Sequence, residues 1–244
     1  MDSIGVLELS VFVFATFAGA LIAGIVGFAF GLVAAGLWLH VLTPTQSTIL
    51  IVAFGLTVQA MSVWRLRRAL RLERLLPFII GGAIGVPVGV VLLRAVPAAG
   101  ARVGMGVILV AFSIYSLMQP KLPHFSNAGK LADAAIGVAS GIVGGSTGLA
   151  GILAVMWCTL RGWPKDEQRG VFQPVAVFIF ILTALWLGVS GSIDSPIVFL
   201  YLLGLPSLLA GTWIGLKLYG RINETIFRRI VLALLLASGL SLIV

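Results

Sequence analysis

The sequence predicts an all-α membrane protein of two inverted repeats, each a glycine-broken re-entrant helical hairpin plus three transmembrane helices. Three observations support this prediction: the composition, a series of eight apolar stretches, and a glycine pattern present in both halves of the chain. Hydrophobic residues make up 60% of the 244 residues and charged residues only 10%. A soluble domain carries about a quarter charged residues, so soluble enzymes, secreted disulfide-stabilised domains and disordered chains are excluded.

The eight apolar stretches account for nearly the whole chain. A transmembrane helix needs about 20 residues, so the chain has room for roughly eight spans and for no separate soluble domain. We therefore expect a single transmembrane domain over residues 1–244, with repeat halves at 1–120 and 131–244. The stretches run over residues 7–39, 48–64, 75–93, 102–118, 131–158, 170–189, 196–219 and 226–244.

The first and fifth stretches carry glycines in their middle. Both contain the pattern Gly-Ile-Val-Gly-x-x-x-Gly-Leu, which begins at Gly24 and again at Gly141, 117 positions later (141 − 24). A second pair of glycine-rich segments begins at Gly85 and at Gly211, with an offset of 126 (211 − 85). These matches predict an internal duplication, which is common among secondary transporters.

The distribution of Lys and Arg between the stretches predicts the topology. If all eight stretches cross the membrane once, the two sides receive 7 and 9 of the 16 basic residues. If the first and fifth stretches turn back at their glycines, the two sides receive 14 and 2. The positive-inside rule favours the second arrangement, with six full spans, inverted halves and both termini on the periplasmic side of a bacterial inner membrane. The alternative is eight simple spans whose orientation is set by other factors.

The second glycine break is the main candidate for a substrate site. It offers backbone N–H groups, two hydroxyls and the positive end of a half-helix dipole, without a fixed negative charge, and so favours an anion. The alternative is close helix packing through small residues. The break consists of Gly144, Gly145, Ser146, Thr147 and Gly148.

Two further sets of residues are weaker candidates for substrate contact. The first glycine break, with Gly27 and Gly31, has apolar side chains and is expected to form an opposite wall or a hydrophobic gate. Gln59 and Gln173 lie inside apolar stretches, where an amide needs a partner. Either a hydrogen bond between helices or contact with the substrate would supply that partner.

Arg161 and Arg169 flank the predicted cytoplasmic mouth of the second hairpin. They could concentrate anions at an entrance, or simply anchor the topology. No acidic residue lies deep inside an apolar stretch, and Asp133 comes closest. No nucleotide-binding or hydrolase motif is present, so we expect no catalytic residue, metal site, cofactor or ATP hydrolysis. The expected partners are a small anionic substrate and the lipid bilayer, without nucleic acid, and a homodimer is a candidate assembly.

The glycine-patterned halves resemble the TauE/SafE sulfite exporter family, and the resemblance covers essentially the whole chain. It is carried by Gly144–Leu149 and by Trp157-Cys158-x-x-Arg161-Gly162-Trp163-Pro164 in the second half. The family's first half usually has a glycine run where this chain has Phe28-Ala29-Phe30, which moves the expected site toward the second break. The resemblance implies movement of sulfite, sulfonates or related sulfur oxyanions across the bacterial cytoplasmic membrane.

Together these observations predict a transporter of small sulfur-containing oxyanions or organosulfonates, with its site between the two hairpins near the middle of the bilayer. A negative-inside potential favours the exit of an anion by about 2.3 kcal/mol per charge per 100 mV, so export without ATP is physically sufficient. The rival hypotheses are a membrane-embedded enzyme and a non-transporting assembly factor. The first would need an ionisable or metal-binding cluster in the bundle, and the second an exposed interaction surface or a soluble extension.

Overall fold

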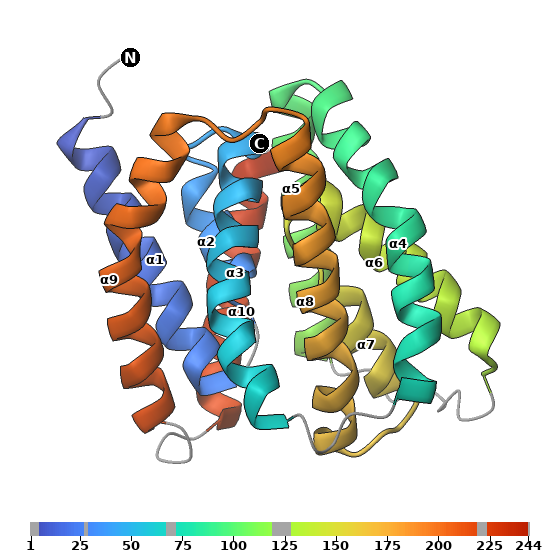
Figure 1. Cartoon of the computed structure of the whole chain (residues 1–244). Coiled ribbons are helices and arrows are strands. Elements are labelled where there is room, and N and C mark those ends of the chain that lie inside the picture. Colours follow the sequence, from blue (N-terminus) through green and yellow to red (C-terminus); the bar gives the residue numbers. More distant parts are fainter. Residues whose placement is uncertain (1–4, 27–28, 67–71, 119–127, 219–223, 244) are drawn as a thin grey trace. The chain divides into compact units, whose positions relative to one another are not determined.

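The computed structural model describes residues 5–26, 29–66, 72–118, 128–218 and 224–243 (Figure 1). All regular structure in these residues is helical, which confirms the all-α prediction. The helices are α1 (Val6–Val26), α2 (Phe30–Trp38), α3 (Pro44–Leu66), α4 (Leu72–Ala95), α5 (Ala98–Met118), α6 (Lys130–Thr147), α7 (Ile152–Leu160), α8 (Lys165–Val189), α9 (Ser195–Leu218) and α10 (Glu224–Ile243).

Long apolar helices fit the predicted membrane protein. Within the described residues, five segments are long and apolar enough to cross a membrane: Val6–Ile25, Leu72–Ala95, Ala98–Met118, Glu167–Val189 and Ser195–Leu218. In contrast, α2 and α7 have nine residues each and are only about 14 Å long, roughly half the thickness of the bilayer core. Neither short helix can cross a membrane by itself. The number of crossings stays a prediction.

The helices group into two compact units, and each is described by itself. The first unit contains Met1–Phe54, Val96–Pro120 and Asp194–Val244, and therefore α1, α2, the first part of α3, α5, α9 and α10. The second unit contains Gly55–Ala95 and Lys121–Ile193, and therefore the rest of α3, α4, α6, α7 and α8. Each unit takes helices from both predicted halves of the sequence, so neither unit is one repeat.

In the first unit, α1 and α2 form a hairpin. At the start of α2, the ring of Phe30 lies against Gly19, 3.2 Å from where a Cβ on that glycine would be. At the end of α2, Trp38 stacks on Phe12 with 5.1 Å between ring centroids and donates its indole N–H to the Phe12 carbonyl at 3.3 Å. The short helix therefore runs antiparallel to α1 and returns the chain to the second turn of α1.

In the second unit, α6 and α7 form a hairpin of the same kind. Near the end of α7, Trp157 donates its indole N–H to the Asp133 carboxylate in the first turn of α6 at 2.7 Å. Near the other end, a Cβ on Gly144 would lie 3.0 Å from the Ala150 methyl group. In each hairpin the start of the long helix lies beside the end of the short helix, and we call this end the open end. We call the opposite end, where the chain passes from the long helix to the short one, the break.

Each hairpin packs its long helix against a helix from the other half of the sequence, with glycine facing glycine. A Cβ on Gly24 of α1 would lie 2.9 Å from the Cα of Gly215 in α9. Likewise, a Cβ on Gly145 of α6 would lie 3.2 Å from the Cα of Gly89 in α4. Because the obstructing atoms are backbone, only glycine allows these helices to approach so closely.

The glycine contacts also correct the alignment of the two halves at α4 and α9. Gly85 packs on the carbonyl of Val138, and Gly215 packs on the carbonyl of Leu21. Leu21 and Val138 are 117 positions apart (138 − 21), the offset already found between the two hairpins. The offset between α4 and α9 is therefore 130 (215 − 85), one helical turn more than the 126 derived from the sequence.

Candidate functional site

The second break ends one helix and begins another. Gly148 follows α6 with a left-handed φ of 74°, and its N–H donates to the Gly144 carbonyl at 2.8 Å. Glycine adopts this conformation without the strain that a Cβ would add. The next helix, α7, begins at Ile152. The first turn of a helix leaves N–H groups without intrahelical acceptors and carries the positive end of the dipole, so this break can attract an anion.

The two hydroxyls of the second break are hydrogen-bonded to the backbone. Ser146 donates to the Ile142 carbonyl at 2.8 Å, and Thr147 donates to the Val143 carbonyl at 2.6 Å. The Thr147 oxygen also accepts the Leu149 N–H at 3.2 Å. Both hydroxyl protons are therefore occupied in this structure, and Thr147 helps to fix the turn that leads into α7. The donors that the break can direct at an anion are mainly backbone N–H groups.

Gly144 and Gly145 also pack closely against neighbouring helices. Gly144 faces Ile179 of α8, whose side chain lies 2.5 Å from where a Cβ would be. A Cβ on Gly145 would lie 2.7 Å from the carbonyl oxygen of Val86 in α4. These two glycines therefore allow close packing between helices, which was the alternative to substrate binding. Their contact with a substrate stays a prediction.

Gln59 and Gln173 are both buried, and both belong to the second unit. Gln173 lies one turn before Ala176 in α8, and Ala176 faces the start of α7, with 3.9 Å between its methyl group and a Cβ placed on Gly151. Residues one turn apart share a helix face, so Gln173 lies on the face of α8 that packs against α7. The structure thus brings both amides into the unit that holds the second break. Their contact with a substrate stays a prediction.

The first break differs from the second in both backbone and side chains. Its left-handed residue is Ala29, with a φ of 83°, rather than a glycine. Gly31 lies half-buried in the first turn of α2, and Gly27 lies outside the described residues. The aromatic rings of Phe30 at the start of α2 and Trp38 at its end pack together and with Phe54, at centroid distances of 5.9 Å. The predicted apolar character of this break agrees with these contacts.

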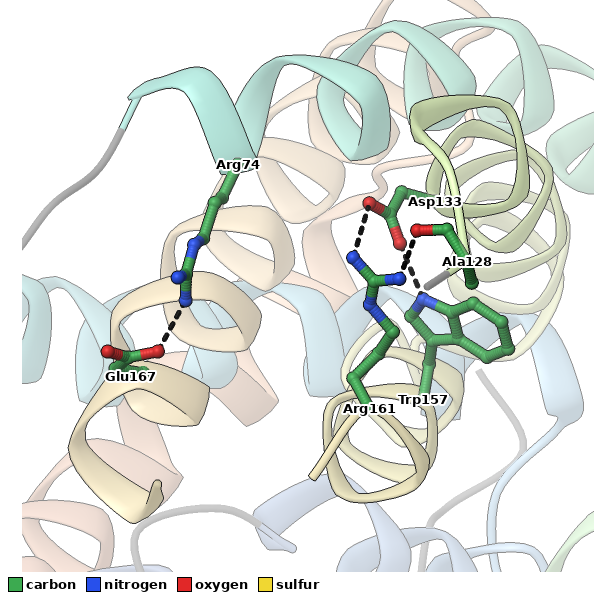
Figure 2. Close-up of polar contacts among 6 residues, drawn as sticks. All are labelled: Arg74, Ala128, Asp133, Trp157, Arg161 and Glu167. Carbon is green, nitrogen blue, oxygen red and sulfur yellow. Dashed lines mark hydrogen bonds and ion pairs between the residues drawn. The ribbon is translucent and has the colours of Figure 1, made fainter. Parts of the chain in front are cut away.

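An ion pair joins the two helices at the open end of the second hairpin (Figure 2). Arg161, just after α7, lies 3.8 Å from the Asp133 carboxylate and also donates to the Ala128 carbonyl. Trp157 holds the other carboxylate oxygen. Asp133 is only 5% exposed, and the Arg161 side chain only 12%. We call Asp133, Trp157 and Arg161 the clasp. The clasp gives Arg161 a structural partner. The entrance role of Arg161 stays a prediction.

A family model described as Sulfite exporter TauE/SafE matches residues 11–242 of the chain. The chain belongs to the TauE/SafE family. The resemblance found in the sequence is thereby confirmed, and the long apolar helices fit a multi-pass protein of this membrane transporter family. No curated protein and no solved structure matches the chain.

In this TauE/SafE protein, the second unit carries most of its described basic residues at the open end of its hairpin, with Arg94 in the last turn of α4 as an exception. Arg74 at the start of α4 pairs with Glu167 in the first turn of α8 (Figure 2). The guanidinium carbons of Arg74 and Arg161 lie 4.8 Å and 5.2 Å from the centre of the Trp163 ring, and the negative ring face favours these cations. Arg169 is half-buried in the second turn of α8, at the same end.

In the first unit, Lys217, Arg228 and Arg229 lie at the break instead. Gly211 packs on the Phe17 carbonyl and Gly215 on the Leu21 carbonyl, so α1 and α9 run in the same direction and Lys217 near the end of α9 lies at the break. Arg102 in α5 is the exception, because the nearby Gly106 packs against Leu242 and Ile243 at the end of α10. Arg228 and Arg229 belong to the second turn of α10. The other end of α10 lies at the open end, where the His40 ring is 3.2 Å from the Ser241 hydroxyl. Most of the described basic residues therefore lie at the open end of the hairpin in the second unit of this TauE/SafE protein, but at the break of the hairpin in the first unit.

Proposed function

We propose that this protein exports small sulfur-containing oxyanions or organosulfonates, such as sulfite, across the bacterial cytoplasmic membrane without ATP hydrolysis. Membership of the TauE/SafE family over residues 11–242 is the observation that carries the proposal. It favours transport over a membrane-embedded enzyme or an assembly factor. The inside-negative potential supplies the driving force, about 2.3 kcal/mol per charge per 100 mV.

The proposed topology consists of six full spans and two re-entrant hairpins in inverted repeats, with both termini in the periplasm. Three features support it. Each hairpin returns the chain to the end at which it began, and each has a return helix about 14 Å long, too short to cross the bilayer. In addition, basic residues collect at the open end of the second hairpin but at the break of the first. If basic ends face the cytoplasm, the hairpins enter the membrane from opposite sides.

The proposed substrate site is centred on the second break. The positive end of α7 attracts the anion, and the glycines let backbone N–H groups approach it. The buried amides on α3 and α8 supply further donors, and two arginines at the open end form the entrance. The site residues are Gly144, Gly145, Ser146, Thr147, Gly148, Gln59 and Gln173, and the entrance residues are Arg161 and Arg169. Contact of the substrate with Gly27 and Gly31 of the first break stays a prediction.

Efflux from proteoliposomes tests the proposed function. Vesicles containing the purified protein are loaded with sulfite or sulfoacetate, and the external anion is followed over time. A potassium gradient with valinomycin sets the potential. We expect efflux well above that of protein-free vesicles, and faster when the inside is negative. Efflux no faster than from protein-free vesicles would contradict the proposal.

Substitutions at the second break test the proposed site. Changing Ser146→Ala together with Thr147→Ala removes the hydroxyls and the bond to the Leu149 N–H that fixes the approach to α7. We expect about fivefold lower flux from a folded protein, the size of one lost neutral hydrogen bond, here the one that orders the approach to α7. Gly151→Ala is the matched control. A Cβ there meets only the Ala176 methyl group, at 3.9 Å, so flux should be unchanged.

Labelling of introduced cysteines tests the topology. With Cys158→Ala as background, His40→Cys should react with an impermeant reagent from the periplasm, and Gly129→Cys only from the cytoplasm. Labelling of His40→Cys from the cytoplasmic side would show that the first apolar stretch crosses the membrane, and would contradict the first re-entrant hairpin.

A further inference from the structure

Arg74 is the more exposed of the two arginines that lie over the Trp163 ring. The guanidinium carbons of Arg74 and Arg161 are 4.8 Å and 5.2 Å from the centre of this ring. The Arg161 side chain is only 12% exposed, because the clasp and the Ala128 carbonyl enclose it. The Arg74 side chain is 32% exposed. Of the two, Arg74 is therefore the arginine that a solute at the open end of the second hairpin can reach.

The Trp163 ring is held in place by the backbone around it. The Trp163 N–H donates to the Cys158 carbonyl of α7 at 3.3 Å, and the Trp163 carbonyl accepts from the Gln168 side chain of α8 at 2.8 Å. The negative face of an indole ring attracts a guanidinium without occupying its N–H groups. The ring can therefore hold the Arg74 guanidinium while the partner of its N–H groups changes.

Glu167 occupies Arg74 with a group that resembles the proposed substrate. Its carboxylate accepts a hydrogen bond from a guanidinium nitrogen of Arg74 (Figure 2). A carboxylate and a sulfite or sulfonate group both present oxygens that share a negative charge, and a guanidinium binds such oxygens in pairs. The Glu167 side chain is 35% exposed, and an exposed ion pair is weak, so a dissolved oxyanion can replace the carboxylate.

We propose that Arg74 is the first binding position for the exported anion, which takes the place of the Glu167 carboxylate on the guanidinium. This inference rests on the proposed function and adds a residue to the entrance of the same site. Because Glu167 competes with the anion, it keeps the complex weak, and a transported solute must be able to leave each position that it binds.

Uptake of radiolabelled sulfite and, in parallel, sulfoacetate into inside-out membrane vesicles tests the assignment, because the proposed cytoplasmic face then meets the bath. Arg74→Gln should raise the KM for the anion about fivefold, the size of one exposed ion pair, with a smaller change in the maximal rate. Glu167→Gln removes the competing carboxylate and should lower the KM about twofold. In an Arg74→Gln background Glu167→Gln should have no effect, because the competition needs the guanidinium.

Two control variants remove the same kinds of charge from positions outside the proposed contact. Successive glycines of α4 pack on successive turns of α6, so the two helices run in the same direction and Arg94 in the last turn of α4 lies toward the break. Arg94→Gln therefore removes a positive charge far from the open end. Glu73→Gln removes an exposed acid next to Arg74 in sequence, and neighbouring residues of a helix do not face each other. Neither control should change the KM.

The outcomes separate this assignment from the function on which it rests. Wild-type vesicles that take up neither anion faster than vesicles without the protein would overturn the proposed function and the Arg74 contact with it. Saturable wild-type uptake with the same KM in Arg74→Gln would overturn only the contact. A lower maximal rate at an unchanged KM would show a structural role for Arg74, and an equal fall in KM for Glu73→Gln and Glu167→Gln would show a general effect of charge. Either of these results would also overturn the contact.

Discussion

The first hairpin is packed with aromatic rings, whereas the second is packed with glycines and held by an ion pair. Both join a long helix to a helix of nine residues, and in both a tryptophan of the short helix donates its indole N–H to the long helix. In the first hairpin the acceptor is a backbone carbonyl and the tryptophan ring stacks on Phe12. In the second hairpin the acceptor is the carboxylate of Asp133, which also faces Arg161.

This difference teaches that the two hairpins share a backbone plan while their side chains have diverged. Close glycine contacts hold the long helix of each hairpin to a partner helix at matching positions, so the plan is maintained by backbone approach. The side chains around each break can then differ without changing how the long helix packs. In the described residues, buried hydroxyls without a hydrogen-bond partner occur in both units, at Ser47, Ser113 and Thr212 in the first and at Ser140 and Thr183 in the second. The breaks themselves differ in their side chains, because the second has Ser146 and Thr147 and the first has Phe30.

Removing the acid of the clasp should have the largest effect on stability. Asp133→Ala leaves the Arg161 guanidinium buried without its counter-charge, which should cost about 3–5 kcal/mol of unfolding free energy. Unfolding in mixed detergent micelles would measure it. Glu167→Ala is the matched control, because the Arg74 and Glu167 side chains are 32% and 35% exposed and an exposed pair contributes about 1 kcal/mol or less.

A double variant separates the charge from the packing of the clasp. Asp133→Ala combined with Arg161→Met removes both charges, so it should be less destabilising than Asp133→Ala alone. If the double variant instead loses more stability than Asp133→Ala alone, the uncompensated Arg161 charge is not what destabilises the single variant. The ion pair would then not be what distinguishes the second hairpin from the aromatic first hairpin.

The all-helical character could be predicted from the sequence, and the glycine pattern that occurs in both halves corresponds to close helix contacts. Gly24 and Gly141 both face a partner helix in the structure. The inverted repeat itself stays a prediction. The alignment of α4 with α9 was shifted by one turn, since several glycines at helical spacing allow more than one match. Only the contacts with α1 and α6 select Gly85 and Gly215 as equivalents.

The candidate site was less predictable because it depends on pairings between distant residues. Nothing in the spacing of Asp133, Trp157 and Arg161 showed that a nine-residue helix would bring them together. Composition also suggested hydroxyl donors at Ser146 and Thr147, but a hydroxyl within a helix readily bonds to the carbonyl one turn earlier. Without the fold, these hydroxyls could not be distinguished from those that remain unpaired.

Adding a methyl group at the glycine contacts should have an intermediate effect, similar in both units. Gly85→Ala and Gly215→Ala each place a Cβ against the backbone of the facing helix, which cannot move aside as a side chain can. We expect a loss of about 1–3 kcal/mol of unfolding free energy for each. Gly104→Ala in α5 is the control. It has nothing within 4 Å of the added Cβ, and alanine is the better helix former, so it should be neutral or stabilising. A tolerated Gly85→Ala would show that close backbone approach does not hold α4 to α6.

Exchanging the left-handed residues of the two breaks should have the smallest effect and opposite signs. Ala29 has a φ of 83° and Gly148 a φ of 74°, a conformation that costs a residue with a Cβ about 1–2 kcal/mol. Gly148→Ala should therefore be destabilising by about that amount. Ala29→Gly should be stabilising by about 1 kcal/mol or less, because the added freedom of the unfolded chain offsets part of the relief. Thermal unfolding of both variants beside the wild type would measure the two shifts. An unchanged or lowered stability for Ala29→Gly would mean that the aromatic packing around Phe30, rather than the backbone of Ala29, determines how the first break turns.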